Sequence, residues 1–179
     1  LESNWHIYFM RSTGVKVGLT ALIFYAFFGA VLSNQVYPQV SLTQSDRNAM
    51  AWIADSIPAG SRFVIVTGES EPFSDAVSEW FPALADSTSL ATVQGYEWLP
   101  GGQFEKRMGA YSALQTCMNA STDCVEEWVA SQGETFEYIL VSKDELVKNG
   151  SPLVSSLSTA AGYQVVYQEG DVLIFKVTD

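Results

Sequence analysis

The longest apolar stretch of the chain lies close to its N-terminus. Residues 17–32 carry no charge, and the wider stretch 14–34 contains a single charged residue, Lys16. A helix of roughly 20 apolar residues crosses the hydrocarbon core of a bilayer, which is about 30 Å thick. The lysine can extend its amine to the headgroups, so it does not exclude a membrane position. We therefore predict a transmembrane helix over 14–34, with a buried core helix and a removable signal peptide as the alternatives.

The two flanks of this helix predict how it is oriented. Residues 1–13 contain several aromatic side chains, which suit a membrane interface, and residues 35–44 are an expected extended linker. Arg11 and Lys16 both lie on the N-terminal side of the apolar stretch. By the positive-inside rule, the chain from Asn34 onward then lies outside the cytoplasm.

The remainder of the chain alternates short β-branched runs with amphipathic helical patterns. Ser45 is the expected N-cap of the first helix, whose apolar residues recur at helical spacing. The expected elements are helices over 45–57, 75–85, 104–114, 125–129 and 152–161, and strands over 62–67, 89–93, 136–142, 163–167 and 172–177. This order predicts one extracytoplasmic α/β domain over 45–179. It should have three α/β/α layers, a mainly parallel sheet and an antiparallel C-terminal hairpin at one edge.

Charge narrows the function classes open to this domain. The chain carries 9 basic and 20 acidic residues, for a formal net charge of −11, and only one acidic residue, Glu2, precedes the apolar stretch. Such a domain repels polyanions, which excludes nucleic-acid binding and disfavours contact with anionic headgroups. We interpret the acidity as a source of solubility in preference to a specific cation site. Because the first residue is Leu1, we expect the chain to be processed or to be part of a longer protein.

The loops after the first two predicted strands carry the candidate chemistry. Loops at the carboxyl ends of neighbouring parallel strands converge on one edge of a sheet. Carboxylates beside aromatic rings there suit carbohydrate recognition, because carboxylates bind hydroxyls and flat rings pack on the apolar face of a sugar. A divalent cation is a second interpretation of the same carboxylates. In a third, Trp80 and Trp98 lie in the core while the acids cap helices or stay solvated. The candidate substrate-binding residues are Glu69, Asp75, Glu79, Trp80, Gln94, Glu97 and Trp98.

Several catalytic classes are excluded or unsupported by composition. His6 is the only histidine, and it precedes the apolar stretch, so the domain cannot hold a Ser-His-Asp triad or a histidine metal site. The glycine spacings match neither a phosphate-binding loop nor a dinucleotide fingerprint. We therefore assign no catalytic residue and no metal site, and we expect no cofactor apart from the divalent cation already considered.

Two cysteines and two sequons bear on the compartment. Cys117 and Cys124 lie between two predicted helices, and in an oxidising compartment we expect them to form a disulfide in preference to two buried thiols. Asn119 and Asn149 each begin an Asn-X-Ser sequon, a pattern that is frequent by chance.

Four segments of the predicted domain carry a family resemblance. They are 47–58 (RNAMAWIADSIP), 62–66 (RFVIV), 75–84 (DAVSEWFPAL) and 91–98 (ATVQGYEW). Together they resemble the C-terminal extracytoplasmic domain of bacterial multi-span (GT-C type) membrane glycosyltransferases. These enzymes use lipid-phosphate-linked sugars and are related in plan to protein mannosyltransferases and oligosaccharyltransferases. The resemblance extends over about 45–177, and the preceding span is similar to a last transmembrane helix.

The resemblance implies a binding role for this chain. In the family, the catalytic carboxylate usually lies in the first extracytoplasmic loop, which the resemblance does not cover. The implied partners are a lipid bilayer, other transmembrane helices or membrane-complex subunits, and a lipid-linked sugar. A second hypothesis is a single-pass accessory or scaffolding subunit of a larger membrane complex, without catalysis of its own. The residues implied to bind substrate or acceptor are Glu79, Trp80, Gln94, Glu97 and Trp98.

Overall fold

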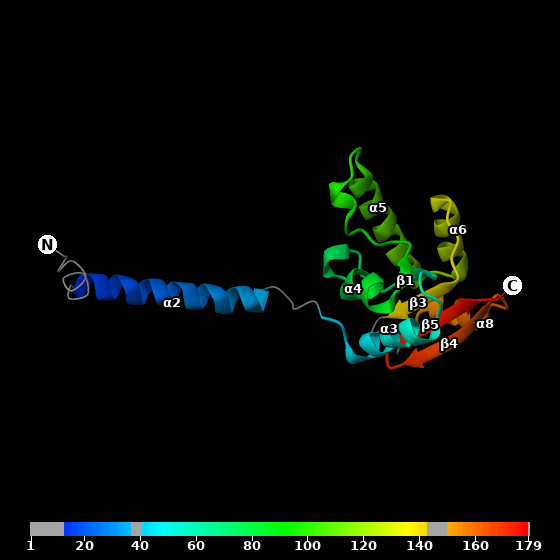
Figure 1. Cartoon of the computed structure of the whole chain (residues 1–179), viewed down its shortest axis with the longest axis horizontal. Coiled ribbons are helices and arrows are strands. Elements are labelled where there is room, and N and C mark those ends of the chain that lie inside the picture. The colour runs from blue at the N-terminus through cyan, green and yellow to red at the C-terminus, as the bar shows by residue number, and fades with distance from the viewer. Residues whose placement is uncertain (1–12, 37–40, 143–149, 179) are drawn as a thin grey trace. The chain divides into compact units, whose positions relative to one another are not determined.

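The computed structural model describes residues 13–36, 41–142 and 150–178, which form two units, Leu1–Gln39 and Val40–Asp179 (Figure 1). Three predictions concern residues outside the described ranges. They are the interfacial segment up to residue 12, which includes His6 and Arg11, the linker residues 37–40, and the sequon that begins at Asn149.

The first unit contains one described helix, α2 (Thr13–Val36). Its stretch from Thr13 to Leu32 is long and apolar enough to cross a membrane, as the sequence predicts. The large apolar side chains from Val17 to Leu32 are exposed, unlike those of a core helix. Length and composition of this kind are shared by membrane spans and signal sequences.

The second unit is a mixed α/β domain whose elements follow the predicted order. Its helices are α3 (Gln44–Ser56), α4 (Ala76–Ala85), α5 (Gln103–Thr116), α6 (Thr122–Gln132) and α8 (Pro152–Thr159). Its strands are β1 (Arg62–Val66), β2 (Thr88–Ser89), β3 (Tyr138–Ser142), β4 (Tyr163–Glu169) and β5 (Val172–Val177), and its short 3₁₀ turns are η1 (Pro72–Ser74), η2 (Tyr96–Trp98) and η3 (Cys117–Asn119).

The strands form one sheet in the order β2-β1-β3-β5-β4. Strand β1 pairs in parallel with β2 and β3, whereas β5 pairs antiparallel with both β3 and β4. The prediction of a mainly parallel sheet is therefore correct only for its β2–β1–β3 side. The C-terminal hairpin occupies the other side, with β5 inside and β4 at the edge. Burial explains this order, because β5 has four consecutive buried residues and β4 has none.

The second predicted strand is much shorter than expected. Strand β2 ends at Ser89, although Leu90, Ala91 and Val93 are buried. The amide of Leu90 still donates to the carbonyl of Phe63 at 2.9 Å, after which the chain leaves the sheet. An apolar run is therefore buried here as irregular chain, which periodicity alone does not distinguish from a strand.

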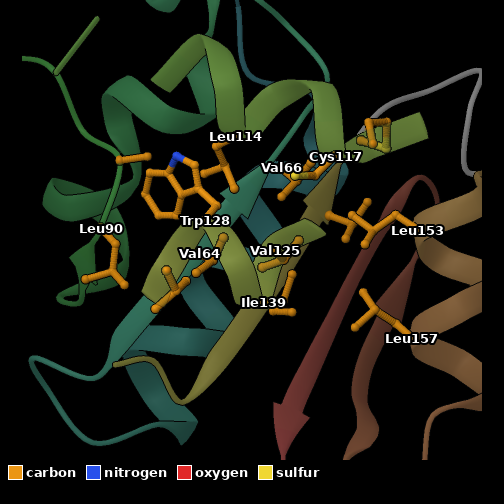
Figure 2. Packing of buried hydrophobic residues seen from close by; sticks show 14 of the residues in the cluster. Val64, Val66, Leu90, Leu114, Cys117, Val125, Trp128, Ile139, Leu153 and Leu157 are labelled. Carbon is orange, nitrogen blue, oxygen red and sulfur yellow. The ribbon is translucent and has the colours of Figure 1, made fainter. Parts of the chain in front are cut away.

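Alternate residues of the strands enter two separate cores. Val64 and Ile139 pack with residues of α5, α6 and α8, and Figure 2 shows them beside Leu114, Val125 and Leu157. The other core contains strand residues together with residues of α3 and α4: Phe63, Ile65, Leu140, Ile174, Ala49, Met50, Ile53, Val77, Phe81 and Ala85. The two-residue period of a strand produces this division, since successive side chains point to opposite faces.

The first helix of the domain is capped by a different residue from the one predicted. Thr43 is the N-cap, and it forms a capping box with Asp46, whose backbone N–H donates to Thr43 Oγ1 at 3.1 Å. Ser45 lies inside α3. A Cβ at Gly170, in the turn between β4 and β5, would collide with the Ser45 side chain. Gly170 also has φ of +54°, which glycine adopts without strain, so both the available space and the backbone favour glycine in this turn.

The predicted disulfide is confirmed. Cys117 of η3 and Cys124 of α6 are bonded, with their Cα atoms 5.6 Å apart. The bond joins the end of α5 to α6 beside the core shown in Figure 2. It is consistent with an oxidising, extracytoplasmic environment.

Candidate functional site

The loop after β1 holds a buried carboxylate, Asp75. Its side chain is the N-cap of α4 and accepts from the Ser78 backbone N–H at 3.0 Å. The other carboxylate oxygen accepts from the hydroxyls of Ser78 (2.7 Å), Thr67 (2.7 Å) and Tyr111 (2.6 Å). Only 4% of Asp75 is exposed. The prediction that acids in this region cap helices is therefore confirmed for Asp75, whose oxygens are occupied by groups of the domain itself.

Tyr111 of α5 remains a proton donor to this carboxylate over a wide pH range. Burial raises the pKa of the Tyr111 phenol above its usual value, and the negative charge of Asp75 raises it further. Among the described residues, the one salt bridge joins Arg62 to Glu134, so Asp75 is stabilised by hydroxyl and amide donors without a basic side chain. Hydrogen bonds to the ionised form offset the cost of burying its charge.

A buried glutamine fixes the beginning of the same loop. Gln115 of α5 accepts from the backbone N–H groups of Thr67 (2.8 Å) and Gly68 (3.0 Å), and donates to the Ile65 carbonyl at 3.1 Å. Further along, the Ser112 hydroxyl donates to the Ser70 carbonyl at 3.0 Å. Loop 67–75 is thus held against α5 along most of its length.

The loop after β2 places its candidate residues at the surface. Glu97 and Trp98 belong to η2 and are both exposed, Trp98 to 82%. Gln94 precedes the turn and is half-buried. Arg107 of α5 supports the turn, because its Nε donates to the Thr92 carbonyl at 3.0 Å. Its guanidinium also lies 4.8 Å from the ring centre of Tyr96.

The remaining candidate residues belong to other elements than Glu97 and Trp98. Glu69 is half-buried and accepts from the Glu71 backbone N–H at 3.2 Å. Glu79 and Trp80 are exposed on α4, where Trp80 lines a pocket between α3 and α4. The alternative interpretation of Trp80 and Trp98 as core residues is wrong, because they are 49% and 82% exposed. The seven predicted residues therefore lie in three different settings: the buried network around Asp75, the surface of α4, and the two loops that rest on α5.

No group of three or more His, Cys, Asp or Glu residues suited to a metal ion occurs within the described ranges. The carboxylates of Glu69, Asp75 and Glu97 thus do not form a metal-binding group there. What the site offers chemically is hydrogen-bond acceptance and an aromatic surface.

Sequence reasoning missed the residues that hold the loops in place. Tyr111 entered only as one residue of the predicted helix 104–114, and neither Gln115 nor Arg107 was singled out. A usable signal exists, because Tyr111 and Gln115 are four residues apart and so share one face of α5. The pattern shows a shared face but does not show which loop that face supports.

Comparison with known proteins is negative: no protein family, no curated protein and no solved structure matches this chain.

Proposed function

We propose that this chain is the extracytoplasmic, membrane-anchored domain of a glycosyltransferase that uses a lipid-linked sugar, and that it contributes substrate or acceptor binding. In this proposal α2 spans the membrane. The charge bias of Arg11 and Lys16 supports a cytoplasmic N-terminus, and the disulfide supports an oxidising location for the domain. The two cores on opposite strand faces support a three-layer α/β/α arrangement.

The observation that carries the binding role is the exposed pair Glu97 and Trp98. Trp98 is 82% exposed and the adjacent Leu99 is 49% exposed, so this turn presents apolar surface to water that a ligand can cover. The indole ring offers a flat surface for the apolar face of a sugar ring. The adjacent carboxylate offers two acceptor oxygens for sugar hydroxyls.

The rest of the site positions this pair. Arg107 holds the turn that contains Tyr96, and the Asp75 network holds the neighbouring loop against the same helix, α5. Pre-organisation of this kind reduces the entropy lost when a ligand binds. Gln94 and Glu69 are further acceptors and donors at the two loops, while Glu79 and Trp80 belong to the α4 surface.

The test is sugar transfer by the full-length protein in its native membranes, with Trp98→Ala and Glu97→Gln. We expect each change to raise the KM for the bound substrate about tenfold, since a lost ring or charge-assisted contact weakens binding by about 1.4 kcal/mol. Trp52→Phe is the control, because Trp52 belongs to α3 and packs against Tyr167 of β4 in a tilted arrangement, with ring centres 5.0 Å apart. Unchanged transfer in both site variants would contradict the proposal.

The accessory-subunit hypothesis makes a different prediction about mass. An antibody to the domain should detect, in native membranes, a polypeptide several-fold larger than 19.6 kDa if the domain belongs to a multi-span enzyme. A denatured mass near 19.6 kDa would favour the single-pass subunit.

A further inference from the structure

A pocket between α3 and α4 is separate from the two loops discussed above. Its volume is about 550 Å³, within the range of small-molecule sites. Its walls include Leu42, Arg47, Met50 and Ala51 on one side and Trp80 and Leu84 on the other.

Helix geometry accounts for the two walls. Arg47, Met50 and Ala51 are spaced three and four residues apart on α3, and Trp80 and Leu84 are spaced four apart on α4, so each group shares one helix face. Among the lining residues Met50 is buried, whereas Trp80 and Leu84 remain about half exposed. The pocket is thus apolar and open to solvent.

The pocket has a single charge. Arg47 is exposed and is the one charged residue among the described residues that line it. Its guanidinium donates to the Leu42 carbonyl at 3.4 Å, which leaves most of its five N–H donors available. Arginine binds phosphate through two parallel hydrogen bonds, so this wall is complementary to a phosphate group.

The pocket also lies close in the chain to the apolar helix. Ser41 lines the pocket, and only residues 37–40 separate it from Val36, the last residue of α2. The chain between Val36 and Ser41 spans at most about 18 Å, at about 3.5 Å per residue. If α2 crosses a membrane, Ser41 at the pocket is therefore joined to the membrane-spanning segment by only five residue steps of chain.

We propose that this pocket binds the phosphodiester headgroup and upper acyl chains of a zwitterionic bilayer phospholipid. Arg47 meets the phosphate, while Trp80, Leu84 and Met50 contact the glycerol and acyl region, a combination of side chains that suits a membrane interface. The chain has a net charge of −11, so a strongly anionic surface repels it and a headgroup without net charge does not. The proposal rests on the membrane anchoring in the proposed function and is independent of sugar binding.

The test is photo-crosslinking in vesicles. The full chain is reconstituted into phosphatidylcholine vesicles that contain some phosphatidylcholine with a diazirine near the glycerol, then irradiated, digested and mapped by mass spectrometry. We expect α4 peptides containing Trp80 and Leu84 to be labelled several-fold more than peptides from α6. These vesicles contain no other protein, so a protein partner cannot account for the label.

Two variants sharpen the result. Arg47→Gln removes the phosphate donor, and Ala51→Phe fills the pocket from an exposed position, so each should lower α4 labelling several-fold. Lys106→Gln is the matched control, because it removes an exposed cation from α5 and should leave the label unchanged.

Three outcomes would overturn the proposal. Uniform labelling over the domain, or labelling that neither pocket variant lowers, would contradict the lipid site without contradicting the membrane anchor. Loss of labelling when inorganic phosphate is added before irradiation identifies an ion site in place of a lipid site. Failure of the chain to float with the vesicles removes the anchor itself, and with it the membrane part of the proposed function.

Discussion

The loops after β1 and β2 leave the same side of the sheet and both rest on α5, yet they use their polar residues differently. In loop 67–75, Asp75 is buried and accepts hydrogen bonds from Thr67, Ser78 and Tyr111. In loop 94–102, Glu97 and Trp98 are exposed, and only the base of the turn is held by Arg107. A carboxylate at the end of a strand can therefore be structural or available to a ligand, and its partners decide between these roles.

The largest expected difference between the loops is in stability. Asp75→Ala leaves three buried hydroxyls without their acceptor and removes the cap of α4, so we expect it to lower the free energy of unfolding by about 3–4 kcal/mol. Urea denaturation followed by circular dichroism measures this change. Glu79→Ala, an exposed change four residues further on, is the control and should stay within about 0.5 kcal/mol. Equal effects of the two substitutions would remove the distinction between structural and available carboxylates.

The second effect concerns α5, which supports both loops. Replacing Cys117 and Cys124 by serine releases the end of α5 from α6 and restores entropy to the unfolded chain, so we expect a loss of about 2.5 kcal/mol. Chemical denaturation of the double variant, compared with the oxidised parent, checks this value. If the double variant stayed folded and only loop 67–75 changed its structure, α5 would not be the common support of both loops that we infer.

The third effect is a pH dependence specific to the buried network. The pKa of Tyr111 is raised, so above pH 10 the folded state keeps a proton that the unfolded state releases. The unfolded state then binds fewer protons, and stability falls as the pH rises, by up to about 1.4 kcal/mol per pH unit for one group.

Tyr111→Phe should therefore reduce the slope of unfolding free energy against pH between pH 10 and pH 11. The slope should not vanish, because burial and Glu169 also raise the pKa of Tyr167, to about 12. Denaturation series at several pH values measure the slope. An unchanged slope in the variant would show that Tyr111 does not keep its proton in the folded state.

The smallest expected effect lies in the second loop. Trp98→Ala should change the free energy of unfolding by no more than about 0.5 kcal/mol, because the side chain is largely in water already. Trp128→Ala is the matched control: Trp128 is 7% exposed, its indole N–H donates to the Ala110 carbonyl at 2.7 Å, and its loss should cost about 3–5 kcal/mol. A large loss for Trp98→Ala would mean that Trp98 supports the fold and is not reserved for a ligand.

The sequence predicted the elements better than it predicted their pairing. The helices at α3, α4, α5 and α8 begin and end within a few residues of the expected positions, because their apolar spacing and their Pro and Gly boundaries act locally. The length of β2 and the N-cap of α3 were wrong. Both depend on neighbours: the chain leaves the sheet after the Leu90 N–H donates to Phe63 of β1, and Thr43 caps α3 through Asp46.

The candidate site was predictable only in outline. The sequence identified the two loops, and their common edge followed from the parallel β1–β2 pairing. It could not distinguish Asp75 from Glu97, because Tyr111, which donates to Asp75, lies 36 residues away along the chain. It also gave no indication of the pocket between α3 and α4, since that pocket depends on the packing of two helix faces that look like ordinary amphipathic surfaces when read separately.

By itself, the sequence determined the apolar helix, the alternation of strands and helices and the disulfide, since each depends on residues close together in the chain. It also determined the acidic charge, which depends on composition alone. The tertiary structure alone decided the position of β5 inside the sheet, the burial of Asp75, the exposure of Trp98 and the pocket beside Arg47. These features depend on partners that are distant in sequence. Burial and hydrogen bonding act through space. The sequence pattern therefore shows which polar and apolar side chains are present, but not which groups they contact in the fold.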